Sequence, residues 1–100
     1  MDFYPETPIF EWDEAKNRLN QDKHGVTFEQ ARQAFTDPNR MIFKDLDHSI
    51  DEDRFFCLGQ AGACVMTVRF TYRDQRIRIF GAGYWRKGKG IYDNGRRSLH

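Results

Sequence analysis

The spacing of apolar side chains changes near residue 40 from a helical period to a period of two. Before that point Phe28, Ala31, Ala34 and Phe35 recur at intervals that place them on one face of a helix. After it apolar and polar residues alternate, most clearly over 64–72, as they do in a half-buried strand. The pattern predicts a helical first part and a β-rich second part.

Capping signals mark the ends of two helices. Asp13 can accept hydrogen bonds at the start of a helix that runs to about Lys23, and Gly25 suits the left-handed position behind it. The run 27–30 (Thr-Phe-Glu-Gln) is a capping box for a second helix that continues to Phe35.

The other predicted elements are strands separated by turns. We expect strands at 9–12, 41–43, 54–59, 64–72 and 76–80, an acidic loop at 45–53, and a short C-terminal helix at 85–92. The last strands form an antiparallel meander because their turns are short. Two helices packed on one face of the antiparallel sheet give a two-layer α+β domain, with β-α-α-β-β-β as the predicted order.

One hundred residues are enough for a single domain, assigned here to 1–100. Residues 1–8 are expected to be a loose lead-in and 93–100 a flexible tail. No run approaches the roughly 20 apolar residues of a membrane span, and no signal peptide is recognisable, so a cytoplasmic location is expected. Cys57 and Cys64 are too few for a disulfide scaffold, and both are expected to be small buried hydrophobes.

Charge is distributed unevenly along the chain although the net charge is +1. Residues 1–68 carry 7 Lys/Arg and 13 Asp/Glu, whereas residues 69–97 carry 9 Lys/Arg and 2 Asp/Glu. The net charges of these two parts, −6 and +7, predict a basic surface on the C-terminal third. The alternative is that the acidic part neutralises the basic part within the fold.

Basic and aromatic side chains of that third are candidate contacts for RNA. Arg76 and Arg78 project from one face of the last strand, with Arg69 of the neighbouring strand expected on the same face. Guanidinium groups bind phosphate oxygens in a bidentate manner. The residues that follow interleave aromatic and basic side chains, as single-stranded RNA requires: Tyr84, Trp85, Arg86, Lys87 and Lys89. Alternatively, these charges only solubilise a strand face, and the two aromatic rings close the core.

Other candidate chemistry is less specific. His24, next to Lys23, can act as a general acid or base in attack by a 2′-hydroxyl, or it can simply cap a helix end. The run 83–90 fits the G-x-x-x-x-G-K part of a phosphate loop but has glycine where Ser or Thr must bind magnesium. The histidines lack metal-ligand spacing, and the acidic run at 45–53 is a solvated loop, a divalent-ion site or an inter-chain contact.

Several segments together resemble the BrnT family of toxins. The resembling segments cover about residues 10 to 84 and follow in the family's order: Phe10–Asn17, Lys23–Ala31, Phe35-x-Asp37-Pro38, Asp47–Ser49, Glu52-x-Arg54-Phe55-x-x-Leu58-Gly59, and Arg76-x-Arg78-Ile79. Each segment is weak evidence alone, but their order and spacing are specific.

The resemblance implies a RelE-like fold and a ribonuclease toxin of a type II toxin–antitoxin system that arrests translation without a metal or other cofactor. It also implies neutralisation by a BrnA-type antitoxin whose ribbon-helix-helix domain binds operator DNA, with a toxin dimer possible inside a heterotetramer. Candidate catalytic residues are Lys23, His24, Arg76, Arg78 and Arg86, and candidate RNA-binding residues are Arg69, Tyr84, Trp85, Lys87 and Lys89.

One position departs from the family pattern. Many members end the last strand with Ser-Ala-Arg, whereas this chain has Gly81-Ala82-Gly83. Arg86 and Lys87 could replace the arginine, the chain could belong to a divergent subgroup, or catalysis could be lost. The alternative function is therefore a non-catalytic module that acts as a co-repressor with its DNA-binding antitoxin.

Overall fold

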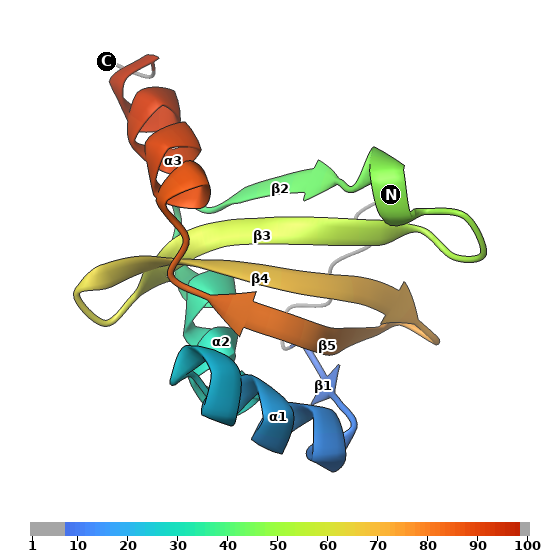
Figure 1. Cartoon of the computed structure of the whole chain (residues 1–100). Helices are drawn as coiled ribbons and strands as arrows, with labels where there is room; N and C mark the ends of the chain where they lie inside the picture. The colour runs from blue at the N-terminus through green and yellow to red at the C-terminus, as the bar shows by residue number, and fades with distance from the viewer. Residues whose placement is uncertain (1–7, 99–100) are drawn as a thin grey trace.

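Five strands form one sheet in the order β1-β5-β4-β3-β2 in the computed structural model, which describes residues 8–98 (Figure 1). The strands are β1 (Phe10–Glu11), β2 (Met41–Lys44), β3 (Arg54–Ala61), β4 (Cys64–Arg73) and β5 (Arg76–Gly83). β2 to β5 pair in antiparallel fashion, and the short β1 runs parallel to β5. The predicted meander and the five expected strands are therefore confirmed, whereas the predicted order β-α-α-β-β-β contains one strand too few after the helices.

Helical segments lie on both sides of this sheet. They are α1 (Glu14–His24), α2 (Phe28–Ala31), the 3₁₀ turns η1 (Arg32–Thr36) and η2 (Leu46–His48), and α3 (Arg86–Ser98). The predicted α+β class is thus confirmed, and α1 and α2 pack on one face as predicted, whereas α3 packs on the opposite face (Figure 1). No helix of residues 8–98 is long and apolar enough to cross a membrane.

The predicted caps are present in α1 and α2. The Asp13 carboxylate accepts hydrogen bonds from the first turn of α1, and Gly25 has the left-handed φ of 68°. Thr27 and Gln30 form the reciprocal capping box. The second helix nevertheless tightens into a 3₁₀ turn from Arg32, a change that apolar residues three apart do not reveal because both helix types accept this spacing.

The sequence predicts the ends of β5 and α3 too early. β5 continues to Gly83 rather than ending at Phe80, and α3 continues to Ser98 rather than ending at residue 92. Much of the tail expected at 93–100 is therefore helical, and residues 99–100 lie outside the described part. The lead-in expected at 1–8 lies outside it too, apart from Pro8.

The main core lies between the sheet and the two N-terminal helices. Its fully buried members include Phe28 and Ala34 from the helical segment, and Cys57, Val68 and Phe70 from the strands. Alternate residues of β3 and β4 point into this core, which the period of two predicted. Cys57 is buried as expected, but the expectation for Cys64 is wrong, because Cys64 is exposed where the β3–β4 turn ends.

A β-bulge in β5 changes which residues face the core. Phe70 pairs with Ile79 and Arg69 pairs with Gly81, so Phe80 is an extra residue without a partner in the register. Ile77 and Ile79 are buried before the bulge, and Ala82 is buried after it. Phe80 joins the second face of the sheet, where Arg69 already lies.

α3 covers part of that second face. A Cβ atom at Gly88 would lie 2.1 Å from the Thr67 hydroxyl, so the close approach of α3 to β4 requires a glycine. Farther along α3 the Tyr92 hydroxyl donates a hydrogen bond to the Asp37 carboxylate, which also accepts from the backbone N–H of Gln60. These contacts fix α3 across the end of the sheet.

The Asn20 side chain fixes α1 to β5. Its amide nitrogen donates to the carbonyl oxygens of Val26 and Ala82, at 2.9 and 3.0 Å, and its oxygen accepts from the backbone N–H of Ala82 at 3.1 Å. Asn17, one turn earlier, accepts from the N–H of Phe28. Both asparagines are buried, so polar side chains replace the apolar face that α1 largely lacks.

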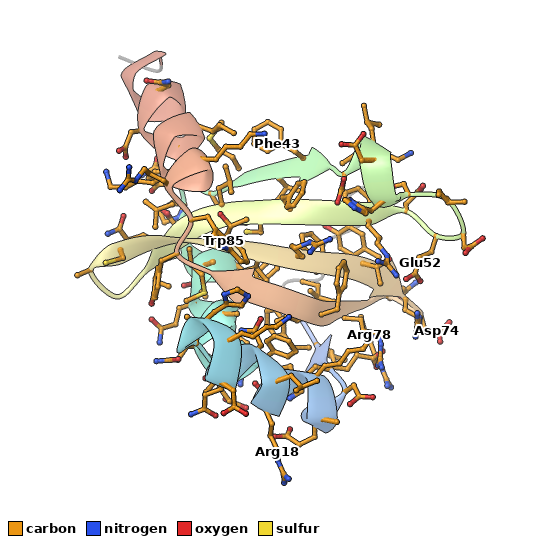
Figure 2. All side chains as sticks on the ribbon, viewed as in Figure 1. Arg18, Phe43, Glu52, Asp74, Arg78 and Trp85 are labelled. Carbon is orange, nitrogen blue, oxygen red and sulfur yellow. The ribbon has the colours of Figure 1, made fainter. Side chains whose placement is uncertain are left out.

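We predict that Asn20→Ala lowers the free energy of unfolding by about 2–4 kcal/mol, since it leaves buried backbone groups without hydrogen bonds. Arg18→Ala is the matched control, because Arg18 lies on the same helix and points into solvent (Figure 2). Its effect should stay within about 0.5 kcal/mol. Urea unfolding of both variants measures the difference, and equal effects would show that the Asn20 hydrogen bonds do not stabilise the fold.

Candidate functional site

The end of α1 and the end of β5 enclose a hollow of about 260 Å3, called here the His24 hollow. Its lining includes three candidate residues of the sequence prediction, Lys23, His24 and Arg69, together with Trp85. The rings of His24 and Trp85 meet edge to face with their centroids 5.1 Å apart. The structure thus brings together residues from three separate segments of the chain, and Asn20, which fixes α1, lies in the same lining.

Arg69 is held in this hollow by its aliphatic stem. The stem lies over Gly81, where an added Cβ would be 3.5 Å from Cδ, and the guanidinium carbon lies 5.4 Å from the centre of the Phe80 ring. On the same ring, Arg54 lies 4.6 Å from the centroid. Within the described residues, the Arg69 Nε is buried and has no hydrogen-bond partner. Because Nε is buried, a ligand cannot reach that donor directly; Arg69 contributes to the hollow as a half-buried guanidinium group, the group that binds phosphate oxygens in proteins.

Trp85 occupies the space beside Gly83, the position at which the family pattern has arginine. A Cβ atom at Gly83 would lie 2.8 Å from Cζ2 of the indole. A side chain at position 83 would therefore displace Trp85 from its place. The glycine and the tryptophan form one structural unit, and the indole, not a cation, lies over the end of β5.

A second hollow of about 510 Å3, the Tyr84 hollow, lies on the other side of Trp85. Tyr84, Trp85, Arg86 and Lys89 line it together with the exposed Cys64. Lys89 is engaged with Asp93 at 2.7 Å in an ion pair within α3. The structure therefore separates Arg86 from the His24 hollow, and Trp85 is the residue that the two hollows share.

Arg76 and Arg78 lie far from both hollows. Figure 2 shows Arg78 and Trp85 at opposite ends of β5. Both arginines form ion pairs with Glu11 of β1, at 3.5 Å for Arg76 and 3.2 Å for Arg78. Arg69 and Arg78 face the same side of the sheet, as predicted, but the structure does not bring them into one cavity.

The acidic loop has a structural arrangement of its own. Asp45 is buried, and its carboxylate lies 2.9 Å from Nδ1 of His48. Ser49 donates to the Asp45 carbonyl oxygen, and Lys44 pairs with Asp53. No group of three or more His, Cys, Asp or Glu side chains in residues 8–98 is arranged to hold a metal ion.

Comparison with protein families shows to which family the chain belongs. Residues 12–88 match the family model described as the ribonuclease toxin BrnT of type II toxin–antitoxin systems. The chain belongs to the BrnT family. A search of curated proteins found no match. The family is named as a ribonuclease toxin, and a type II toxin has a cognate antitoxin as its partner.

Sequence reasoning missed several residues of this BrnT surface. Phe80, which the sequence places at the end of the last strand without a role, lies between the guanidinium groups of Arg54 and Arg69. Glu11 was not recognised as the partner of Arg76 and Arg78. At position 83 the sequence shows the absence of the family arginine. The signal for the position of Trp85 was that a glycine, which has no side chain, stands two residues before an aromatic residue.

We predict that the two cysteines differ in reactivity. Burial raises the pKa of the Cys57 thiol to about 12, so it stays protonated and unreactive at neutral pH, whereas Cys64 is exposed in the Tyr84 hollow. Iodoacetamide should therefore modify Cys64 alone in the folded protein and both cysteines in urea, as mass spectrometry of peptides would show. Equal labelling of both in the folded state would contradict the described packing around Cys57.

Proposed function

We propose that this BrnT protein cleaves RNA in the His24 hollow without a metal ion. The observation that carries the proposal is the convergence of Lys23, His24 and Arg69 beside the Trp85 ring. This arrangement offers a proton-transfer group, two cations and a stacking surface within one cavity, which are the groups that cleavage of a single RNA strand needs.

The proposed reaction begins with attack of an RNA 2′-hydroxyl on the adjacent phosphorus. The neutral imidazole of His24 takes the hydroxyl proton, the new P–O bond forms, and the bond to the 5′-oxygen breaks. The Lys23 ammonium can donate a proton to that leaving oxygen. Arg69 meets the negative charge that develops on the phosphate, and Trp85 stacks on a neighbouring base.

The Tyr84 hollow extends this proposed path for RNA. Tyr84 offers a second exposed ring and Arg86 a cation for the next phosphate, and Lys89 could bind phosphate only by leaving its ion pair with Asp93 of the same lining. Lys87 lies on the same helix start as Arg86 but lines a different, apolar groove. Arg76 and Arg78 are proposed to attract RNA from a distance along β5 rather than to contact the reacting phosphate.

The wider proposal follows from the family. RNA cleavage would arrest translation in the cytoplasm, and a BrnA-type ribbon-helix-helix antitoxin would neutralise the toxin and link it to operator DNA. A heterotetramer with two toxin copies is the proposed assembly. The second candidate function, a non-catalytic co-repressor, is favoured by one observation, the occupation of the family arginine's place by Gly83 and Trp85.

We predict that induced expression arrests bacterial growth and that the purified chain cleaves single-stranded RNA in buffer containing EDTA. The expected products carry cyclic phosphates, because the 2′-oxygen is the nucleophile. Co-expression of the antitoxin should restore growth. Normal growth together with intact RNA would favour the co-repressor function, and cleavage that EDTA abolishes would contradict the metal-independent reaction.

We predict that Arg69→Ala reduces the cleavage rate by about 10²–10³-fold, the usual effect of removing one donor aimed at developing charge. Arg73→Ala is the matched control on the same strand, because Arg73 is exposed, pairs with Glu52 and lies outside the hollow. Its rate should stay near that of the unmodified chain. Melting temperatures of both variants separate catalytic loss from unfolding, and equal rates would remove Arg69 from the site.

Arg78→Ala provides a further arm of that experiment. Arg78 is held on a strand between the buried Ile77 and Ile79, so its loss should affect RNA cleavage more than stability. If it acts from a distance, as proposed, the effect on cleavage should weaken as the salt concentration rises. A fall in melting temperature that matches the fall in rate would instead make Arg78 a structural residue.

A further inference from the structure

An apolar groove of about 370 Å3 separates the start of α3 from β2 and β3 on the second face of the sheet. We call it the Phe43 groove; its main lining residues are Phe43, Phe56, Leu58, Trp85, Lys87 and Ile91. Figure 2 shows Phe43 and Trp85 on the two sides of this region. Because Trp85 also lines the His24 hollow and the Tyr84 hollow, the groove adjoins both proposed RNA sites.

The groove exposes more apolar surface than the neighbouring hollows. Phe43 is 41% exposed, Ile91 39% and Trp85 36%, and all three meet in one lining. Among the described residues that form this lining, Lys87 is the single charged one. A contiguous apolar patch beside a charged rim is typical of a surface that another protein covers.

We propose that the Phe43 groove receives an apolar side chain from an acidic segment of the cognate antitoxin, and that this segment covers Trp85 and closes the RNA site. The inference rests on the proposed function, since it explains how that site would be neutralised. A type II toxin has an antitoxin partner, and an anchor of this kind, buried in an apolar pocket with charge at its rim, is the usual centre of a tight interface.

The positive charge of the C-terminal third indicates that the partner segment is acidic. Residues 69–97, which include the rim, carry 9 Lys/Arg and 2 Asp/Glu, so an acidic segment is attracted and a second copy of the same surface is repelled. RNA fits the hollows around it better than the groove itself. Phosphates and base edges need polar groups, and the Thr67 hydroxyl at the groove floor is buried under Gly88.

The test places a carboxylate in the groove with Ile91→Glu. The expected result is that the Kd for the purified antitoxin, measured by calorimetry, rises roughly tenfold or more, because a buried anchor contact is replaced by charge in an apolar pocket and by repulsion from an acidic partner. RNA cleavage without antitoxin should persist, and more antitoxin should be needed to stop it. Ile91→Ala, which adds no charge, should weaken binding in the same direction by a smaller factor.

Ile50→Glu is the matched control, because it makes the same change at an apolar residue that is 88% exposed and lies outside the groove. Its Kd should not change, and melting temperatures should show that all three variants fold. An unchanged Kd for Ile91→Glu would overturn the inference, as would lost cleavage with normal antitoxin binding, which would assign the groove to RNA. If the unmodified chain cleaves no RNA, the proposed nuclease fails but the Kd still tests the groove. If the unmodified chain binds no antitoxin, both the inference and the proposed partnership with this antitoxin fail.

Discussion

The hydrogen bonds of one buried amide, Asn20, determine how the two ends of the proposed site meet. Asn20 joins α1 to the backbone of Ala82 and to Val26 in the connection to α2. α1 has little apolar surface to bury, so these bonds, and not hydrophobic packing alone, set its position on β5. His24 ends the same helix one turn later, and its contact with Trp85 depends on that position.

Close packing around Trp85 is the second constraint. Gly83 leaves room for the indole on β5, and Gly88 lets α3 approach β4, so both glycines of the apparent phosphate-loop motif serve packing. The result is one exposed ring that forms part of three adjoining cavities. A partner that covers this ring cannot leave the RNA site open. The proposed RNA site and the proposed antitoxin groove would therefore be coupled through the shared surface of Trp85.

The sequence predicted what local signals encode and missed what depends on register. The caps at Asp13 and Thr27 and the alternation in β4 are local, and they were read correctly. The bulge at Phe80 is not encoded by a local signal, because nothing in the sequence of β5 shows that one residue will lack a partner on β4. Residue type was enough to propose the basic side chains as site residues. Which of them share a cavity depends on the tertiary fold, so the sequence could not show that Lys23, His24 and Arg69 lie apart from the other candidates, Arg76, Arg78 and Arg86.

The uneven charge of the chain has different consequences at the two ends of β5. At its start, acidic residues of the first part neutralise basic residues of the last part: Glu11 pairs with Arg76 and Arg78, and a hydrogen bond from Arg73 holds the pKa of Glu52 below its usual value. At its end, the described residues offer no such partner to Lys23 or Arg69. The pairing at the start of β5 is the neutralisation within the fold that was the alternative interpretation of the charge pattern. Cleavage is proposed at the Trp85 end because Lys23 and Arg69 lie there without an ion pair to any described residue, whereas Arg76 and Arg78, which share Glu11, are proposed only to attract RNA from a distance.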